Sequence, residues 1–423
     1  MVCFALPASA SGTAFYVSPG GDGPFPCNKS DPCPLSDAVS AAGDGDEISM
    51  AAGTYDVGTD YPQIYSSPYI HGPRTGPPAT IVSSGSAGLF VLGDPRISDL
   101  TIRATSGNGL FVDGAAEVER LRVSANINAL ACLVPRTPGY FRDSSCVNEG
   151  AGPAVGASVS AGAPLTYSYE IANVTAIATG AGASAAGISA QSGLSFTADL
   201  HVSNSIAQGG PTASSISAEN TGGSAHSNIA VDHTNYAQSS ATAGSQVTPG
   251  AGNQGGAAPS FVSATSGDYR QLPDSPTIDA GTKDNGFLPI GPFDFTGEKR
   301  VFAGKPDIGA DEFVGVLSAK AGHRQKLGKL KVKATCLLTV CKLKASGKVK
   351  VGSGRHRVTG KLVKATAKGS DGKARTLRLR LRRKDRSKVS KALRHRSGKA
   401  SIVVKSSGEQ GIHGAKRLRV TVH

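Results

Sequence analysis

The chain has 423 residues, enough for two or three domains, with 5% aromatic residues, no Trp and 54 Gly. This composition excludes a large aromatic-rich core, while 39% hydrophobic residues are too many for a disordered chain. Residues 1–315 carry 28 Asp/Glu and 13 Lys/Arg, a net charge of −15, whereas residues 316–423 carry 3 and 32, a net charge of +29. This asymmetry predicts a domain boundary near Val316.

The amino terminus reads MVCFALPASASGTAFYV, a short apolar run followed by Ala8-Ser9-Ala10, the A-x-A pattern of a signal-peptide cleavage site. The positively charged start of a signal peptide is missing, so we interpret residues 1–12 as a signal-peptide remnant. No apolar run reaches the roughly 18–20 residues of a transmembrane segment. The sequence therefore predicts a secreted, extracellular protein, and we consider association with the cell wall as well.

Six of the seven cysteines fall into close pairs, which are Cys27 and Cys33, Cys132 and Cys146, and Cys336 and Cys341. No C-x-x-C spacing or neighbouring His marks these pairs as metal sites. Local disulfides in an oxidising compartment fit the pattern better, although fifteen pairings of six cysteines are open.

The first predicted element is a short amphipathic helix over residues 34–42, with Leu35, Ala38, Val39 and Ala42 on one face. Downstream, Gly88-Leu-Phe-Val-Leu-Gly93 recurs as Gly109-Leu-Phe-Val-Asp-Gly114, and the segment 97–102 recurs at the same spacing as 118–123. Short strands that repeat with a fixed, short period indicate a solenoid, in which each coil buries its apolar side chains on its neighbours. The predicted helix would cover the first coil, whose strand edges are otherwise unpaired.

Residues 143–269 contain no Lys or Arg and are rich in Ala, Gly, Ser and Thr. Ile188 is echoed by Ile216, and Ile177-Ala178 is echoed by Ile206-Ala207, both at a longer spacing than in the repeat upstream. Coils of variable length are compatible with a parallel β-helix, since insertions in the turns leave the strands stacked. We therefore interpret this region as the middle coils of the solenoid, with glycines at the corners.

Two terminal segments resemble a known family. The front, YVSPGGDG…PLSDAVSAAGDGDEISMAAGTY, resembles the opening of pectin-lyase-like right-handed β-helix proteins. The back, PSFVSATSGDYRQLPDSPTIDAG…FDFTGEKRVFAGKPDIGADEF, resembles the closing region of the choice-of-anchor Q family of secreted bacterial proteins. The resemblance covers about residues 15–313 and implies a right-handed parallel β-helix over 13–315, closed at its back by residues 258–313. It implies no reaction, because this fold hosts many functions.

Residues 316–423 show period-two alternation of apolar residues and cations, with strands predicted at 329–333, 348–351, 376–381, 401–404 and 417–422. Asp385 is predicted to cap a short helix that ends at Leu393. The pattern indicates an immunoglobulin-like antiparallel β-sandwich, and it resembles Lys/Arg-rich carboxyl-terminal modules of secreted actinobacterial proteins. Its charge favours an anionic cell-envelope polymer as partner, although a merely solvated cationic face is the alternative. Without any Phe, Tyr or Trp it offers no stacking platform, so we expect no sequence-specific nucleic-acid binding.

Candidate catalytic residues are sparse. Glu170 and Asp199 have the same spacing as Ile177 and Ile206, so a coil of that length would stack them as a carboxylate pair for a hydrolase. Asp232 beside His233, and Asp199 beside His201, are the acid/base couples of the middle coils. A polysaccharide lyase would need Arg or Lys as the base, and residues 143–269 have neither.

The densest acidic group, KPDIGADEF, contains Asp307, Asp311 and Glu312 and is the one place where we consider Ca²⁺; otherwise we expect no cofactor. The family resemblance instead gives these residues, and Asp279, a structural role in pairing with the last coil. Asp294 and Arg300 are expected to pair their charges across the same segment.

Residues 133–145 are predicted to form a constrained loop that projects from the solenoid, if the flanking cysteines are bridged. Aromatic rings beside arginines suit acidic saccharides. The residues that would contact sugar are Arg136, Tyr140, Phe141 and Arg142. A loop packed down on the solenoid is the alternative.

These observations favour a monomeric, secreted, non-catalytic scaffold that binds carbohydrate or associates with the cell surface. The alternative is a polysaccharide lyase or glycoside hydrolase that acts on acidic polysaccharide. Acids that converge on one face of the solenoid would favour that alternative.

Overall fold

The structure is a computed structural model that describes residues 12–126, 130–150, 155–161, 166–181, 185–193, 197–302, 304–315, 317–337, 340–353, 356–369, 373–394, 396–408 and 413–423. The chain divides into two compact units, residues 1–313 and 314–423. The expected signal-peptide remnant lies outside the described residues except for Gly12. None of the described helices has the length and apolar character needed to cross a membrane.

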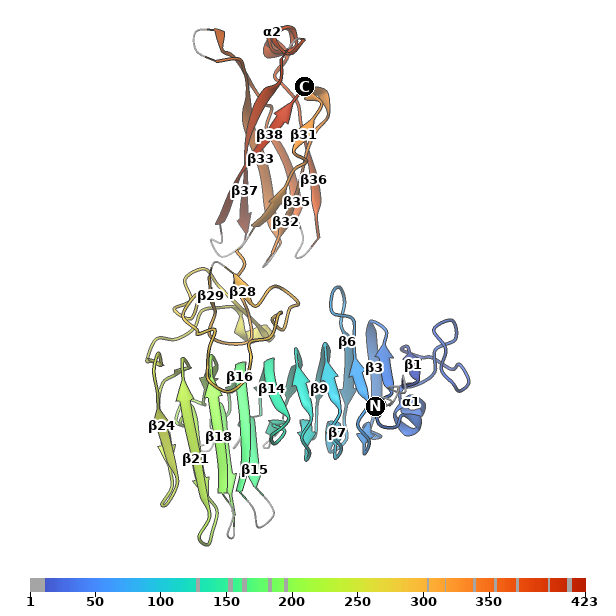
Figure 1. The fold of residues 1–423 in the computed structure, drawn as a ribbon, viewed down its shortest axis with the longest axis vertical. Helices are drawn as coiled ribbons and strands as arrows, with labels where there is room; N and C mark the ends of the chain where they lie inside the picture. Colours follow the sequence, from blue (N-terminus) through green and yellow to red (C-terminus); the bar gives the residue numbers. More distant parts are fainter. Residues whose placement is uncertain are drawn as a thin grey trace, which may run out of the picture. The chain divides into compact units, whose positions relative to one another are not determined.

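Unit 1 is a parallel β-helix, as predicted, in which each coil contributes strands to three faces (Figure 1). The first face consists of β1 (Ala14–Val17), β2 (Glu47–Met50), β5 (Tyr69–His71), β8 (Arg96–Ser98), β11 (Glu117–Glu119), β14 (Tyr140–Asn148), β16 (Thr166–Ala178), β18 (Thr197–Ser203), β21 (His226–Asp232) and β24 (Gln246–Pro249). The second consists of β3 (Gly53–Gly58), β6 (Ala79–Ser83), β9 (Leu100–Ala104), β12 (Arg122–Ala125), the ends of β14 and β16, β19 (Ile206–Gln208), β22 (Asn235–Tyr236) and β25 (Gln254–Gly255).

The third face is a separate parallel sheet. Its strands are β4 (Gln63–Ile64), β7 (Ala87–Val91), β10 (Asn108–Val112), β13 (Leu130–Leu133), β15 (Val155–Ala161), β17 (Ile188–Ser192), β20 (Ile216–Asn220) and β23 (Ser239–Ala241). Small and branched apolar side chains from all three faces fill the interior, among them Ile48, Ile102 and Leu110, each with no exposed surface. Because strands of neighbouring coils pair directly, a side chain of one coil stacks on its counterpart in the next.

The repeat predicted upstream is confirmed by the register, since Ile97 pairs with Val118 and Ile102 with Val123. The echo of Ile188 in Ile216 is confirmed as well, because these two residues pair. The echo of Ile177 in Ile206 is wrong, since Ile206 pairs with Thr175. The coil there is two residues longer than the apolar echo indicated, and the register instead places Ala176 opposite Ala207 inside the solenoid.

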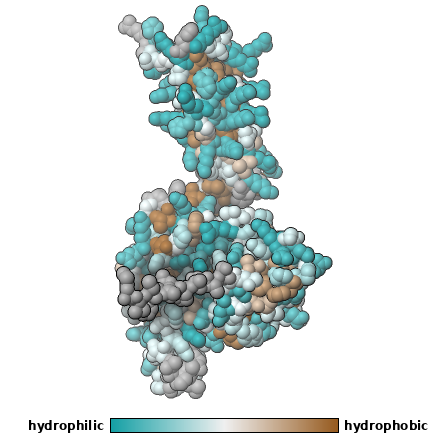
Figure 2. Space-filling model, turned by 45° about the vertical axis from the view of Figure 1, so that its right-hand side comes forward, coloured by the Kyte–Doolittle hydropathy of each residue, from teal (hydrophilic) through white to brown (hydrophobic). Residues whose placement is uncertain are grey.

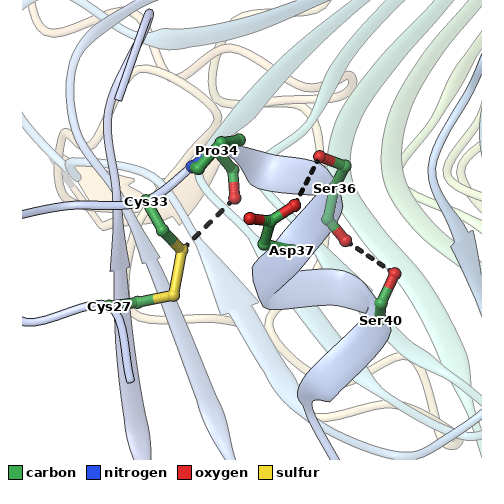
Figure 3. The surroundings of a disulfide bond; sticks show 6 residues. All are labelled: Cys27, Cys33, Pro34, Ser36, Asp37 and Ser40. Carbon is green, nitrogen blue, oxygen red and sulfur yellow. Dashed lines mark hydrogen bonds between the residues drawn. A yellow bond between two sulfur atoms is a disulfide. The ribbon is translucent and has the colours of Figure 1, made fainter. Parts of the chain in front are cut away.

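The predicted amphipathic helix is α1 (Leu35–Ala41), which buries Leu35 and Ala38 at the front of the solenoid. The disulfide between Cys27 and Cys33 lies directly before it (Figure 3). In α1, the Ser40 hydroxyl donates to the Ser36 carbonyl at 2.8 Å, a further bond in a helix that has no side-chain cap at its start.

One corner of the solenoid, between the first and second faces, is built from residues with left-handed backbone. This left-handed corner consists of Asp99, Arg120, Asp143, Asn173, Asn204 and His233, with φ between 42° and 59°. Five of the six are Asp, Asn or His, the non-glycine residues that adopt this conformation most readily. Arg120 is the exception, and its guanidinium is held by two hydrogen bonds to Asp99, at 2.8 and 2.9 Å.

The closing segment does not sit where the sequence predicted. Its hairpin, β26 (Phe261–Ser263) with β27 (Asp268–Gln271), packs Tyr269 against Val147 and Ile177. The following segment, 281–313, runs along the left-handed corner, and we call it the strap. It contains β28 (Val301–Phe302) and β29 (Lys305–Pro306), which pair with each other (Figure 1).

Contacts of the strap follow one another along the corner. Asn204 donates from Nδ2 to the Thr282 carbonyl at 2.7 Å, Arg300 Nε lies 3.6 Å from Asp143 Oδ1, and the Arg74 guanidinium lies over the Phe293 ring at 4.6 Å. The prediction that this segment pairs with the last coil is therefore wrong. The polar corner needs hydrogen-bond partners once it is buried, and the strap supplies them at Asn204, which bonds to Thr282 through both its amide nitrogen and its amide oxygen.

Unit 2 is an antiparallel β domain of two packed sheets, with one short parallel pairing at its edge. One sheet contains β30 (Leu317–Lys320), β32 (Leu330–Cys336) and β36 (Arg375–Leu379). The six-stranded sheet contains β31 (Arg324–Gln325), β38 (His413–Val422), β37 (Gly398–Gly408), β33 (Cys341–Val351), β34 (Val358–Lys361) and β35 (Ala365–Gly369). Alternate apolar residues of both sheets form its core, including Val332, Leu343 and Ile402.

The helix of unit 2 is α2 (Arg383–Leu393), and Asp385 lies in its first turn rather than at its cap. The predicted capping role is therefore wrong. Asp385 instead accepts a hydrogen bond from the Lys361 amide at 2.8 Å and pairs with Lys388 at 2.9 Å, so it fastens the helix to β34.

Candidate functional site

The three catalytic candidates lie on or beside the first face, but not as a stacked pair. Because the coil is longer than expected, Glu170 pairs in register with His201, and Asp199 pairs with Ser168. The Asp199 carboxylate accepts a hydrogen bond from Asn228 at 2.8 Å. The expectation that Glu170 and Asp199 stack directly is therefore wrong.

The predicted acid/base couples are also rearranged. His201 Nε2 lies 3.0 Å from Asp232 Oδ2, on the neighbouring strand, so the couple forms across strands rather than between sequence neighbours. The Phe287 ring of the strap lies 3.8 Å from the His201 ring, centroid to centroid, and His201 is buried. A histidine covered in this way helps to hold the strap and has little access to a substrate.

Carboxylates do lie beside arginines near the first face. Glu119 contacts both Arg120 and Arg142, and Arg120 also pairs with Asp99. Burial lowers the pKa of Arg120, but hydrogen bonds and charges from Asp99 and Glu119 more than offset this, so its pKa is raised. A lyase needs a basic group that can give up its proton, and Arg120 is held in the charged form.

The acidic candidates for Ca²⁺ are buried and serve as hydrogen-bond acceptors within the strap region. Asp307 accepts from the amides of Asp279 and Phe313, at 2.7 and 2.6 Å. Asp311 accepts from the Gln271 amide at 2.6 Å, and Glu312 from the Asp307 amide at 2.9 Å. These carboxylates bond to backbone amides of the closing segment, and the described residues contain no group of three or more His, Cys, Asp or Glu arranged to hold a metal ion.

The segment predicted as a projecting loop is a coil of the solenoid. Cys132 and Cys146 are bonded and fully buried, joining the strands β13 and β14 across the interior. Phe141 is also fully buried, so its assignment to a sugar-binding patch is wrong. The pleat of β14 turns Tyr140 and Arg142 to the outside of the first face, where Arg142 lies 4.5 Å from the Tyr140 ring and bonds to Glu119.

Arg136 alone of the four candidates reaches the third face, where it lines a hollow of about 400 Å³. The outward row of this face explains the hollow. Gln63, Phe90 and Phe111 pair in successive coils, and further along Leu133 pairs with Ser158. Side chains along this row therefore become smaller toward Ser158, and Phe111, Leu133 and Ser158 all line the hollow.

The walls of this hollow carry both apolar and hydrogen-bonding groups. The Arg136 guanidinium lies 5.4 Å from the Tyr167 ring and 3.2 Å from Asp113. Tyr169, Gln191 and Ser160 line the same space. A hollow of this size with aromatic walls and a few convergent polar groups is typical of a small-ligand site.

A second hollow, of about 740 Å³, lies nearer the amino-terminal end of the solenoid, between α1 and the segment 57–66. Its lining includes Gln63, Tyr61 and Tyr65, the last of which is 66% exposed. The Tyr61 ring meets the Phe90 ring edge-on at 6.2 Å, and Phe90 stacks on Phe111 at 4.7 Å. These rings connect the two hollows. We call Tyr65, Tyr61, Phe90, Phe111 and Tyr167, together with the two hollows, the third-face row.

This row was not among the residues predicted from the sequence, although the repeat contains a signal for it. Phe90 and Phe111 occupy the same position of the repeat, and two aromatic residues at an outward position of a repeat indicate an exposed stack. Tyr61, Tyr65 and Tyr167 lie outside the repeat and have no comparable signal.

Unit 2 presents cations on the outer side of its six-stranded sheet. Lys348 pairs with Lys361, Lys350 with Lys399, Lys344 with Lys405 and Lys342 with Lys368. Figure 2 shows hydrophilic side chains over most of the visible surface of this unit.

The third disulfide, between Cys336 and Cys341, joins the two sheets of unit 2.

Comparisons with known proteins do not show a family for this chain. No family model matches it, and no curated protein does either. Among solved structures it is similar to pectate lyase Pel9A, with 16% sequence identity and a TM-score of 0.35, over 72% of this chain and 97% of that one. This likeness carries no inference about activity. The fold, a parallel β-helix followed by an antiparallel β domain, follows from the strand pairing of the chain itself, and membership of the choice-of-anchor Q family stays a prediction.

Proposed function

We propose that this is a secreted, non-catalytic β-helix protein that binds carbohydrate along the third-face row and is retained on an anionic cell-envelope polymer by unit 2. The resemblance of the back segment to choice-of-anchor Q proteins supports secretion, as do three disulfides. The observation that carries the proposal is the third-face row itself, two hollows joined by stacked rings.

The chemistry of the row fits a sugar chain. Pyranose rings present C–H faces that pack on aromatic rings and hydroxyls that need hydrogen bonds, and the row offers Phe111 and Tyr167 beside Ser160 and Gln191. Coils are spaced by about 4.8 Å, so the row from β4 to β15 is about 19 Å long. It is therefore long enough for several sugar units.

The charges along the row favour a neutral chain over the acidic saccharide that the sequence suggested. The hollow beside α1 contains Asp44 and Asp60 and no Lys or Arg among its lining residues. In the other hollow, the charge of Arg136 is balanced by Asp113. A polyanion would be repelled at one end and weakly attracted at the other, whereas neutral hydroxyls can donate to the aspartates and accept from the arginine.

A non-catalytic role is supported by the state of the candidate acids and bases. Asp199, Asp232 and Glu119 are each held by a neighbouring side chain, and the arginines near Glu119 are paired. Glu170 lies beside the covered His201. None of these groups lines either hollow of the third-face row.

A binding screen tests the proposal. The purified chain is incubated with neutral and acidic polysaccharides in the presence of Ca²⁺, and both retention and the length of the polysaccharide chains are measured. We expect retention on at least one neutral polysaccharide without shortening of any chain. Cleavage of any polysaccharide would instead support the lyase or hydrolase alternative.

A further inference from the structure

The outer side of the six-stranded sheet in unit 2 holds an unusual concentration of like charges. We call it the lysine face; it consists of Lys342, Lys344, Lys348, Lys350, Lys361, Lys368, Lys399, Lys405, Arg417 and Arg419. All are exposed except Lys350, which is half-buried. Their registers place four lysine pairs directly opposite one another on neighbouring strands.

This arrangement opposes folding. Directly opposed residues of an antiparallel pair have Cβ atoms about 4.5–5.5 Å apart, and like charges at that distance repel. No member of the lysine face has an ion-pair partner among the described residues of unit 2, where the one acid is Asp385. Asp385 is occupied by the Lys361 amide and by Lys388.

The lysines are not needed for the core. Lys348 and Lys350 alternate with Val349 and Val351, which are buried, so any soluble polar residue could replace them on the outside. Packing does not require these mutually repelling charges. Their presence is explained if an anionic ligand binds to them and neutralises them.

We propose that the lysine face is the binding site for an extended, base-free polyanion of the cell envelope, and that binding relieves the repulsion built into unit 2. This inference rests on the retention role proposed above and assigns it to one sheet. A lysine ammonium group acts as a point charge and lacks the planar, bidentate donor geometry of arginine. The lysine face is therefore expected to select ligands by their density of negative charge and not by the geometry of one anionic group. Unit 2 has no aromatic residue, so bases would add nothing to binding.

The test compares two triple variants of the full chain. Lys344→Gln, Lys348→Gln and Lys350→Gln change the lysine face, and Lys320→Gln, Lys331→Gln and Lys333→Gln change the other sheet by the same charge. Affinity is measured in low salt for inorganic polyphosphate, polygalacturonate and single-stranded DNA. We expect the first triple to lose at least tenfold for the first two probes and the second triple to lose less than threefold.

A stability readout keeps the test independent of misfolding. If the lysines repel one another, the first triple raises the Tm of unit 2 in low salt while it weakens binding, and polyphosphate raises the Tm of the unmodified chain. Equal losses in both triples, or a lower Tm in the first, would overturn the assignment to the lysine face. DNA bound more than tenfold tighter than polyphosphate would overturn the base-free ligand. If the unmodified chain binds no polyanion at all, the retention role itself fails.

Discussion

At the scale of single residues, the left-handed corner places polar groups where water cannot reach them. Asp143 is fully buried and neither of its carboxylate oxygens has a hydrogen-bond partner, although Arg300 and Arg142 lie within 4 Å. Burial raises the pKa of Asp143 to about 7, against the opposing effect of both arginines. Burial likewise raises the pKa of Asp307 to about 6. One acid at the corner that the strap contacts and one acid within the strap therefore keep their protons to a higher pH than an exposed carboxyl does.

These pKa values predict how the stability of unit 1 depends on pH. In the unfolded chain both carboxyls titrate near 4, so their contribution to stability is fully present below that pH and is lost as pH rises toward 7. For Asp143 the loss is on the order of 4 kcal/mol. Calorimetry of the full chain between pH 4.5 and 7.5 should show the Tm of the unit 1 transition falling, and Asp143→Asn should reduce that fall. A Tm that rises over this range would contradict the assignment.

A second residue-scale prediction concerns Arg136 in the third-face row. Its pair with Asp113 is largely exposed, so removing it changes stability little, whereas its guanidinium faces the hollow. A hydrogen bond from a charged donor contributes about 1.5–3 kcal/mol, so Arg136→Ala should lower affinity for the retained polysaccharide by at least tenfold. Arg103→Ala, an exposed arginine on β9, is the matched control and should bind as the unmodified chain does. Equal affinity of both variants would remove Arg136 from the site.

At the scale of elements, the disulfide between Cys132 and Cys146 ties one coil across the interior. Its loop of about 15 residues predicts a loss of about 3 kcal/mol of unfolding free energy when both cysteines are replaced by alanine, through greater freedom of the unfolded chain. Urea unfolding of the double variant measures this. An unchanged midpoint would show that the coil is held by strand pairing alone.

The elements also show what the sequence can and cannot predict. Strands and the stacking of the upstream repeat followed from the spacing of apolar residues, because every coil must bury the same positions. The coil between Asn173 and Asn204 was misjudged, since Ala- and Ser-rich strands offer few side chains that mark the register. The displaced alignment led to the false pairing of Glu170 with Asp199.

The position of the strap could not be predicted from the sequence either. Arg300 lies beside Asp143 of the left-handed corner, which is far away in the sequence, and it donates to the Asp307 carbonyl. Asp294 accepts from the Glu312 amide. Contacts to distant residues and to backbone groups leave no pattern in the sequence. The third-face row likewise depends on Tyr61 and Tyr167, which lie far apart in the chain and meet the same row only through the coils between them.

At the scale of the whole molecule, the two units carry opposite charges and present different surfaces. Unit 1 offers aromatic rings, neutral polar groups and the paired charges of Arg136 and Asp113 along one face, and unit 2 offers cations without Phe, Tyr or Trp. We therefore propose a neutral glycan as the ligand of unit 1 and a polyanion as the ligand of unit 2. Salt separates these roles, because screening weakens contacts between exposed charges and leaves the packing of sugar on aromatic rings largely unaffected.

The most direct test of this account is the dependence of affinity on glycan length. Calorimetric titration uses neutral oligomers of the polysaccharide retained in the screen, with the unmodified chain and with Tyr65→Ala, at high salt. We expect affinity to rise until an oligomer spans both hollows, and Tyr65→Ala to weaken the binding of long oligomers but not of those that fit the hollow at Arg136. Affinity that is independent of length and unchanged by Tyr65→Ala would contradict it.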